Sequence, residues 1–336
     1  MKDKNLKGYY IMLSLLLLGL VIVSLTIGKY EISKHDLWRI LKNAWSNELS
    51  MDEMPAFVIF SVRLPRIFMA VLIGSGLAAA GAGMQAVFKN PLVSDRMLGV
   101  SAGASFGVAL GILIYNNIVF IQLMAFIWGI AAVLFTYIIG KSSKASSVIV
   151  LVLAGLIVSA VFTSLLSLVQ YSAEVDTELP SMIYWLMGSL SGVELQDVKI
   201  VFLPIVLSVG LLFMIRWKLN MLSLSDEEAE ALGLHVKLYR ILVIISSTVI
   251  SATAVSMCGM IGWVGLITPH IGRMLVGTDH EKLMPVSIMI GGIYLLFIDN
   301  LCRLLYSAEL PLSVLTALIG APIFGVLLKK TGGNWI

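Results

Sequence analysis

Long apolar stretches recur along the whole chain, and they limit its possible folds more than any other feature. A helix needs about 20 mostly apolar residues to cross a bilayer. Stretches of this kind lie near 9–28, 66–87, 97–115, 118–140, 148–171, 198–217, 237–257, 263–277, 283–302 and 312–328. A helix satisfies its own backbone groups, as lipid requires. The sequence therefore predicts an all-α, polytopic membrane protein with about ten transmembrane helices.

The composition supports a membrane protein. Hydrophobic residues make up 59% of the chain and charged residues only 13%, whereas soluble domains carry about 25% charged residues. No polar block is long enough to form a second domain, so residues 1–336 are expected to be a single transmembrane domain. The basic residues form no patch that would indicate nucleic acid binding. Cys258 and Cys302 belong to no Cys/His cluster, so no metal site is expected.

The N-terminus resembles a signal peptide, because an apolar run from Tyr9 follows three lysines. The run continues to Gly28 without a clear cleavage pattern, so we expect a retained first span. Ten spans place both termini on one side of the membrane. The connecting segments on that side hold most of the Lys and Arg residues, which predicts cytoplasmic termini.

Arg63 and Arg66 lie on the outer side in this topology, against the positive-inside rule. They stand three residues apart, on one helix face, and Pro65 between them suits a helix start. Snorkelling toward lipid phosphates is one explanation for them. Docking of an acidic partner is the other, because a guanidinium group binds a carboxylate through a planar fork.

The polar segment 219–236 contains the signals of a short acidic helix. Ser225 and Glu228 form a capping-box pattern, Asp226 and Glu227 suit the positive N-terminal end, and Gly233 can end the helix. A solvated loop is the plainer interpretation. The well-formed caps favour a rigid cytoplasmic protrusion that fits a socket on a partner.

Asp299 and Arg303 stand in the ninth span at a spacing that allows an ion pair. Charge inside a membrane is costly, so either a structural pair or a functional role is expected. Arg303 lies near the outer surface and can join Arg63 and Arg66. An ion-coupled secondary transporter that uses Asp299 is the alternative function.

Three other patterns have plainer interpretations. Residues 180–190 are too short to span and predict an outer interfacial helix. Glycines at 99, 103, 107 and 111 predict close helix packing within one protomer. The same region matches G-x-S-x-G around Ser101, but a nucleophile elbow needs a strand before it, so a membrane serine hydrolase is a weak alternative.

The chain resembles the iron-chelate and cobalamin permease family of type II ABC importers. The resemblance covers nearly the whole chain. It rests on RLPR at 63–66, KNPL at 89–92, LGVSAGA at 98–104, YWLMGSL at 184–190, LSLSDEEAEALG at 222–233, GWVGLITPHIGR at 262–273, TDH at 278–280 and ELPLSVLTALIGAPIF at 309–324. It implies the type II ABC importer permease fold in a bacterial cell membrane.

The resemblance also implies partners. Two copies, or this chain and a paralogue, form a dimer and pass the substrate along the axis between them, where the fifth and tenth spans line much of the path. An extracytoplasmic substrate-binding protein docks through acidic residues onto Arg63, Arg66 and Arg303. Two cytoplasmic ATPase subunits bind ATP and Mg, so this chain is expected to bind no cofactor itself and to be no enzyme.

The segment 222–233 resembles the helix that couples such permeases to the ATPase. The residues assigned to coupling are Leu222, Ser223, Leu224, Ser225, Asp226, Glu227, Glu228, Ala229, Leu232 and Gly233. An iron–siderophore complex is the first expectation for the substrate, with haem or cobalamin as alternatives.

Overall fold

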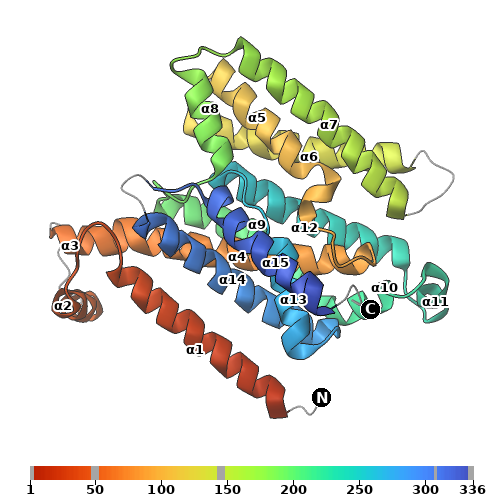
Figure 1. Cartoon of the computed structure of the whole chain (residues 1–336), viewed down its shortest axis with the longest axis horizontal. Coiled ribbons are helices and arrows are strands. Elements are labelled where there is room, and N and C mark those ends of the chain that lie inside the picture. The colour runs from red at the N-terminus through yellow and green to blue at the C-terminus, as the bar shows by residue number, and fades with distance from the viewer. Residues whose placement is uncertain (1–3, 47–52, 142–147, 306–308, 332–336) are drawn as a thin grey trace.

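The structure is a computed structural model that describes residues 4–46, 53–141, 148–305 and 309–331. Within these residues every regular element is a helix (Figure 1). In chain order they are α1 (Lys4–Thr26), α2 (Lys34–Trp45), α3 (Met54–Phe57), the π-helical η1 (Val58–Arg63), α4 (Leu64–Val87), the 3₁₀ turn η2 (Asp95–Leu98), α5 (Val100–Ile114), α6 (Ile118–Lys141), α7 (Val148–Ser172), α8 (Glu178–Met187), α9 (Leu195–Met214), α10 (Arg216–Leu222), α11 (Asp226–Ala231), α12 (Val236–Cys258), α13 (Val264–Val276), α14 (His280–Leu304) and α15 (Leu312–Thr331).

The predicted spans each correspond to a helix. Among the described residues, seven helical segments are long and apolar enough to cross a membrane. Helices α5, α13 and α15 supply three shorter apolar helices, which brings the total to the ten predicted segments. Consistent with this even number, α1 begins and α15 ends on the side of the molecule away from α2, the side on which α11 also lies (Figure 1). This end is called the α11 end, and the opposite end is the α2 end.

The predicted start of the second span, at residue 66, is wrong. Helices α3, η1 and α4 form one apolar segment of 34 residues, Met54–Val87. At 1.5 Å per residue it is about 51 Å long, well beyond the ~30 Å apolar thickness of a bilayer. Arg63 and Arg66 do not mark a boundary with water, because partners inside the protein satisfy both side chains.

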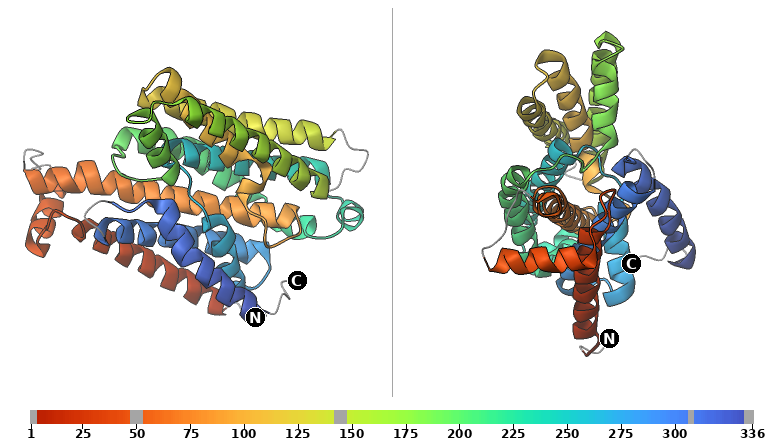
Figure 2. Two further views of the ribbon diagram at one scale, coloured as in Figure 1. Left: turned by 45° about the horizontal axis from the view of Figure 1, so that its top comes forward. Right: turned by 90° about the vertical axis from the view of Figure 1, so that its left-hand side faces the viewer.

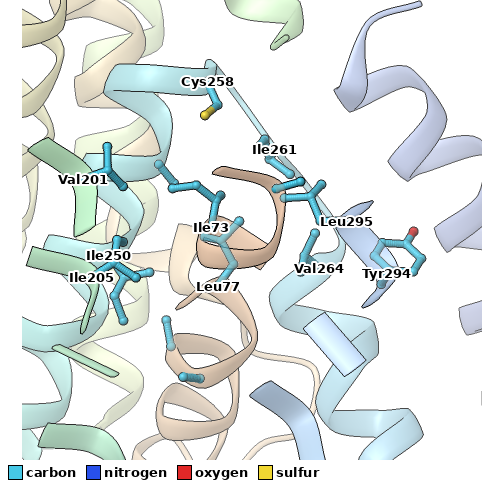
Figure 3. Packing of buried hydrophobic residues seen from close by; sticks show 14 of the residues in the cluster. Ile73, Leu77, Val201, Ile205, Ile250, Cys258, Ile261, Val264, Tyr294 and Leu295 are labelled. Atoms are coloured by element: carbon cyan, nitrogen blue, oxygen red, sulfur yellow. The ribbon is translucent and has the colours of Figure 1, made fainter. Parts of the chain in front are cut away.

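Helix α4 is the centre of the bundle. Nearly all of its residues are buried, and it packs against α9, α12, α13 and α14 (Figure 2). In Figure 3, Ile73 and Leu77 of α4 lie between α9 and α12 on one side and α13 and α14 on the other. A helix surrounded in this way must be apolar on every face, which explains why its sequence lacks amphipathic periodicity.

Glycine allows the neighbours of α4 to approach its backbone. A Cβ atom at Gly81 would lie 1.9 Å from the carbonyl oxygen of Gly265 in α13, and one at Gly74 would lie 2.3 Å from that of Gly291 in α14. Membrane helices gain packing contacts by such small-residue crossings, since lipid tails give them no hydrophobic reason to associate.

Helices α5 to α8 form a group on one side of α4 and α12, while α1 lies on the other side and packs against α14 (Figure 1). Gly103, Gly107 and Gly111 of α5 face α6, whereas Gly99, which precedes α5, lies against α7. A Cβ atom at Gly103 or at Gly107 would lie 2.3 Å from a carbonyl oxygen of α6. The prediction that these glycines serve packing within one protomer is confirmed.

Residues 180–190 were predicted to form a short helix, and α8 confirms it with slightly earlier bounds. It ends before Gly188, which has a left-handed φ of 73°. Gly188 contacts the backbone of Gly259, and its carbonyl oxygen accepts a hydrogen bond from Leu312 N at the start of α15. The ends of α8, α12 and α15 therefore meet at one junction.

Candidate functional site

Two arginines of one helical segment and a third from the distant α14 meet at the α2 end. Arg63 comes from η1, Arg66 from the first turn of α4 and Arg303 from the last turn of α14. Together with Glu309, which precedes α15, they line a pocket of about 220 Å³, called here the arginine pocket. The prediction that Arg303 joins Arg63 and Arg66 is confirmed.

Arg66 is held by two carboxylates. Its Nε donates to both carboxylate oxygens of Asp299, at 2.9 and 3.1 Å, and its second terminal nitrogen lies 2.9 Å from Asp299 Oδ1. The first terminal nitrogen donates to both oxygens of Glu309, at 2.9 Å each. The pairing with Asp299 uses two nitrogens and is therefore the fork-shaped arrangement, which is strong and directional.

Asp299 also pairs with Arg303, whose Nε lies 3.4 Å from Asp299 Oδ2. The ion pair predicted from the i,i+4 spacing is confirmed, although Arg66 makes the closer contacts. Arg303 also donates to Asn300. An intramembrane carboxylate that carries a proton or sodium ion must be able to release its partners, and Asp299 is completely buried between two guanidinium groups.

Arg63 binds neutral groups. Its two terminal nitrogens donate to the carbonyl oxygens of Leu25, in the last turn of α1, and of Tyr30, just beyond that helix. The arginines were expected to present their side chains to a partner from the outer mouth, but all three are buried, with at most 7% of their surface exposed. Any ligand reaches them through the arginine pocket.

The arginine pocket has an excess of positive charge. Lys29, Arg63, Arg66 and Arg303 line the pocket together with a single acid, Glu309, and Asp299 lies behind it on Arg66 and Arg303, so the basic groups outnumber the acidic ones. Buried charge that lacks a full complement of counter-charges is costly. The pocket therefore favours the entry of a carboxylate.

Sequence reasoning missed Glu309. The segment that contains it, ELPLSV, was noted as a family motif without a role for its acidic residue. An isolated acid two residues before the proline that opens an apolar run was the available signal. Its partner Arg66 is 243 residues away in the chain, so no local pattern could connect the two.

The acidic segment at the α11 end is built as predicted, with a shorter helix. Ser225 caps α11, and the reciprocal bonds between Ser225 and Glu228 complete the capping box. Gly233 adopts a left-handed φ of 80°. Leu234 N donates to Ala229 O and Gly233 N donates to Glu230 O, which is the Schellman arrangement.

Asp226 ties α11 to the helix bundle. It accepts from Lys89, just beyond the end of α4, at 2.8 Å, and from Arg240 of α12 at 2.9 Å. Partial burial disfavours the charged carboxylate, but the bonds from Lys89 and Arg240 outweigh that effect and lower the pKa of Asp226 below its usual value of 3.8. At neutral pH the carboxylate is charged and the connection is complete.

The predicted coupling residues divide into two groups. Leu222 is the last residue of α10, and with Ala229 it is buried inside the chain, so these two serve internal packing. Glu227, Glu228, Leu224 and Leu232 are exposed, and Leu232 has 61% of its surface accessible. Two exposed leucines beside an acidic helix form a surface suited to a protein partner.

The fold and the two sites define a multi-pass membrane permease with a charged pocket at one end and a protruding helix at the other. The model of the FecCD transport family matches residues 15–330. The chain belongs to this family of ABC transporter permeases.

Relatives and a solved structure agree with this assignment. The chain is 40% identical to the molybdate import system permease protein MolB of Haemophilus influenzae, with 96% of both chains covered. It is 34% identical to a probable iron chelatin transport system permease protein of Helicobacter pylori, with 98% of this chain and 99% of the relative covered. The solved inward-facing conformation of a putative metal-chelate type ABC transporter matches with a TM-score of 0.86 and 38% identity, over 98% of this chain and 100% of that one.

Proposed function

We propose that this chain is the membrane-spanning subunit of an ATP-driven ABC importer for an iron–siderophore complex or a related metal chelate. It pairs with a second copy or a paralogue and alternates access along the axis between them. Two cytoplasmic ATPase subunits supply ATP hydrolysis with Mg. The α11 end faces the cytoplasm of a bacterial cell, so both termini are cytoplasmic, and the α2 end receives a substrate-binding protein.

One observation carries this proposal. A single buried helix, α4, has Arg66 of the arginine pocket in its first turn and is followed, two residues after its last residue Val87, by Lys89, which holds Asp226 of α11. Because α4 is packed on all sides, a displacement at one end is transmitted to the other. The chain thus connects an external docking point to an internal coupling point.

The relatives favour two substrate classes. An iron chelatin system and a metal-chelate transporter support a chelate, whereas the relative at 40% identity is a molybdate permease. Molybdate is therefore a second candidate, and haem and cobalamin are further ones. Uptake of radioactive iron chelate and of radioactive molybdate into liposomes, each with its own binding protein, distinguishes these substrates.

Docking is tested by the change Arg63→Gln in liposomes that contain the permease, its ATPase and the binding protein. Arg63 donates to the carbonyl oxygens of Leu25 and Tyr30, so glutamine can keep a donor contact while the pocket loses one charge. We expect the binding protein to stimulate ATP hydrolysis at least about tenfold less well, the equivalent of about 1.4 kcal/mol of docking energy. Arg39→Gln is the matched control, since Arg39 pairs with Glu53 at the same end but does not line the pocket. If the binding protein stimulated ATP hydrolysis equally in the two variants, Arg63 would not belong to a docking site.

Coupling is tested by the change Leu232→Glu. The exposed leucine has little to lose inside the chain, so folding is expected to be unaffected, whereas a charge placed in an apolar contact with the ATPase disrupts it. We expect co-purification of the ATPase to fall at least about tenfold. Ser191→Glu places the same charge on an exposed residue at the α2 end and is expected to have no effect. Full ATPase retention by the Leu232 variant would exclude this residue from the interface.

A further inference from the structure

The two carboxylates that hold Arg66 do so in different ways. Asp299 contacts two nitrogens of the guanidinium group and is completely buried. Glu309 places both of its oxygens on a single nitrogen, and 23% of its side chain is exposed. A fork that uses two nitrogens is the stronger arrangement, and burial strengthens charge pairing further. Glu309 is therefore the weaker and more accessible partner of Arg66.

Glu309 stands where it can control the start of α15. The next residue, Leu310, donates from its backbone to Cys302 in α14, and Leu312 donates to Gly188 after α8. Gly188 in turn contacts Gly259 at the end of α12. The bond from Glu309 to Arg66 connects this junction of α8, α12 and α15 to α4.

Basic side chains outnumber acidic ones around the arginine pocket, so the pocket attracts a carboxylate, and Glu309 already occupies one of the positions that such a group can take. Arg66 and Glu309 both line the pocket, so a carboxylate that enters can approach the terminal nitrogen of Arg66 that Glu309 uses. Five donors on one guanidinium group cannot bind three carboxylates equally well when two nitrogens are committed to Asp299. The entering carboxylate and Glu309 therefore compete for Arg66.

We propose that Glu309 is an internal substitute for the partner's carboxylate: when an acidic side chain of the binding protein enters the arginine pocket, it displaces Glu309 from Arg66 and frees the outer end of α15. This inference rests on the proposed function. It explains how docking at the α2 end reaches a helix that the docking protein does not need to touch, because the released residue is part of the segment that leads into α15.

The test is the change Glu309→Gln, with the permease and ATPase in lipid nanodiscs and the binding protein added. Glutamine cannot compete as a charged ligand, so we expect the binding protein to dock about fivefold more tightly. ATP hydrolysis without binding protein is expected to rise, since the connection from Arg66 to the start of α15 is already weakened. Glu53→Gln is the matched control, because it also removes an acid that pairs with an arginine at the α2 end. An affinity for the Glu309 variant that equals or falls below that of the native chain would overturn the exchange.

A second variant protects the test against misfolding. Glu309→Asp keeps the charge on a side chain shorter by one methylene group, and we expect docking tighter than in the native chain but weaker than in the Gln variant. If the Gln variant does not fold, unchanged or weaker docking by the Asp variant counts against the exchange. Failure of the proposed function is separate, because it appears in the native chain as ATP hydrolysis that no binding protein stimulates.

Discussion

Replacing Asp299 by asparagine is expected to destabilise the protein by about 3–5 kcal/mol, the typical cost of removing one member of a buried ion pair. The change leaves the buried Arg66 and Arg303 with Glu309 as the remaining carboxylate of the pocket. Neither guanidinium group can lose its proton, so the uncompensated charge cannot be relieved by titration. The neighbouring helices must open or admit water.

The two cysteines provide the measurement. Cys258 and Cys302 are both buried, so a thiol-reactive fluorescent dye reports unfolding in detergent as the cysteines become accessible. We expect the Asp299 variant to react at a clearly lower temperature than the native chain. Asp176→Asn, at an exposed position, is the control and should leave the transition unchanged. A transition within about 1 °C of the native one would show that the network contributes little to stability.

The same variant separates the two classes of transporter. If uptake by the native chain followed a proton or sodium gradient, Asp299 would be the residue to bind the ion, as the alternative function requires. The structure gives this carboxylate a different task, because both of its oxygens accept from Arg66. We therefore expect uptake by the native chain to require the ATPase and to be independent of ion gradients.

The second large effect is expected for Gly81→Ala. The added methyl group would lie 1.9 Å from the carbonyl oxygen of Gly265, so the backbones of α4 and α13 must separate. Overpacking of a core costs about 1–3 kcal/mol and sometimes more. Because the obstacle here is backbone and cannot rotate away, we expect the upper part of that range.

Gly210→Ala in α9 is the matched control. A Cβ atom there meets no neighbour within 4 Å. Alanine is the better helix former, so this variant should gain about 0.5–1 kcal/mol. In the thiol assay, we expect the unfolding temperature to fall for the Gly81 variant and to rise for the Gly210 variant. If the unfolding temperatures of both variants shifted by the same amount, the close crossing of α4 and α13 would not determine stability.

Much of the fold was predictable because its signals are local. The ten apolar segments follow from composition along the chain, since lipid imposes the same requirement on each helix separately. The caps of α11 are also local: Ser225 and Glu228 stand three residues apart, and Gly233 supplies the left-handed residue that ends the helix. The pairing of Asp299 with Arg303 needed only one helical turn.

The functional sites needed the tertiary structure. Arg66 finds its carboxylates 233 and 243 residues away, and Lys89 reaches Asp226 across 137 residues. Charge in the sequence suggested exposed arginines, whereas packing of α4, α14 and the end of α1 buries them. By itself, the sequence determined that the chain lies in lipid, where its helices are and, through resemblance, to which family it belongs. Only the packing decided which charges meet, because an ion pair in a bundle depends on distance in space, and the order of residues along the chain sets that distance only within a few helical turns.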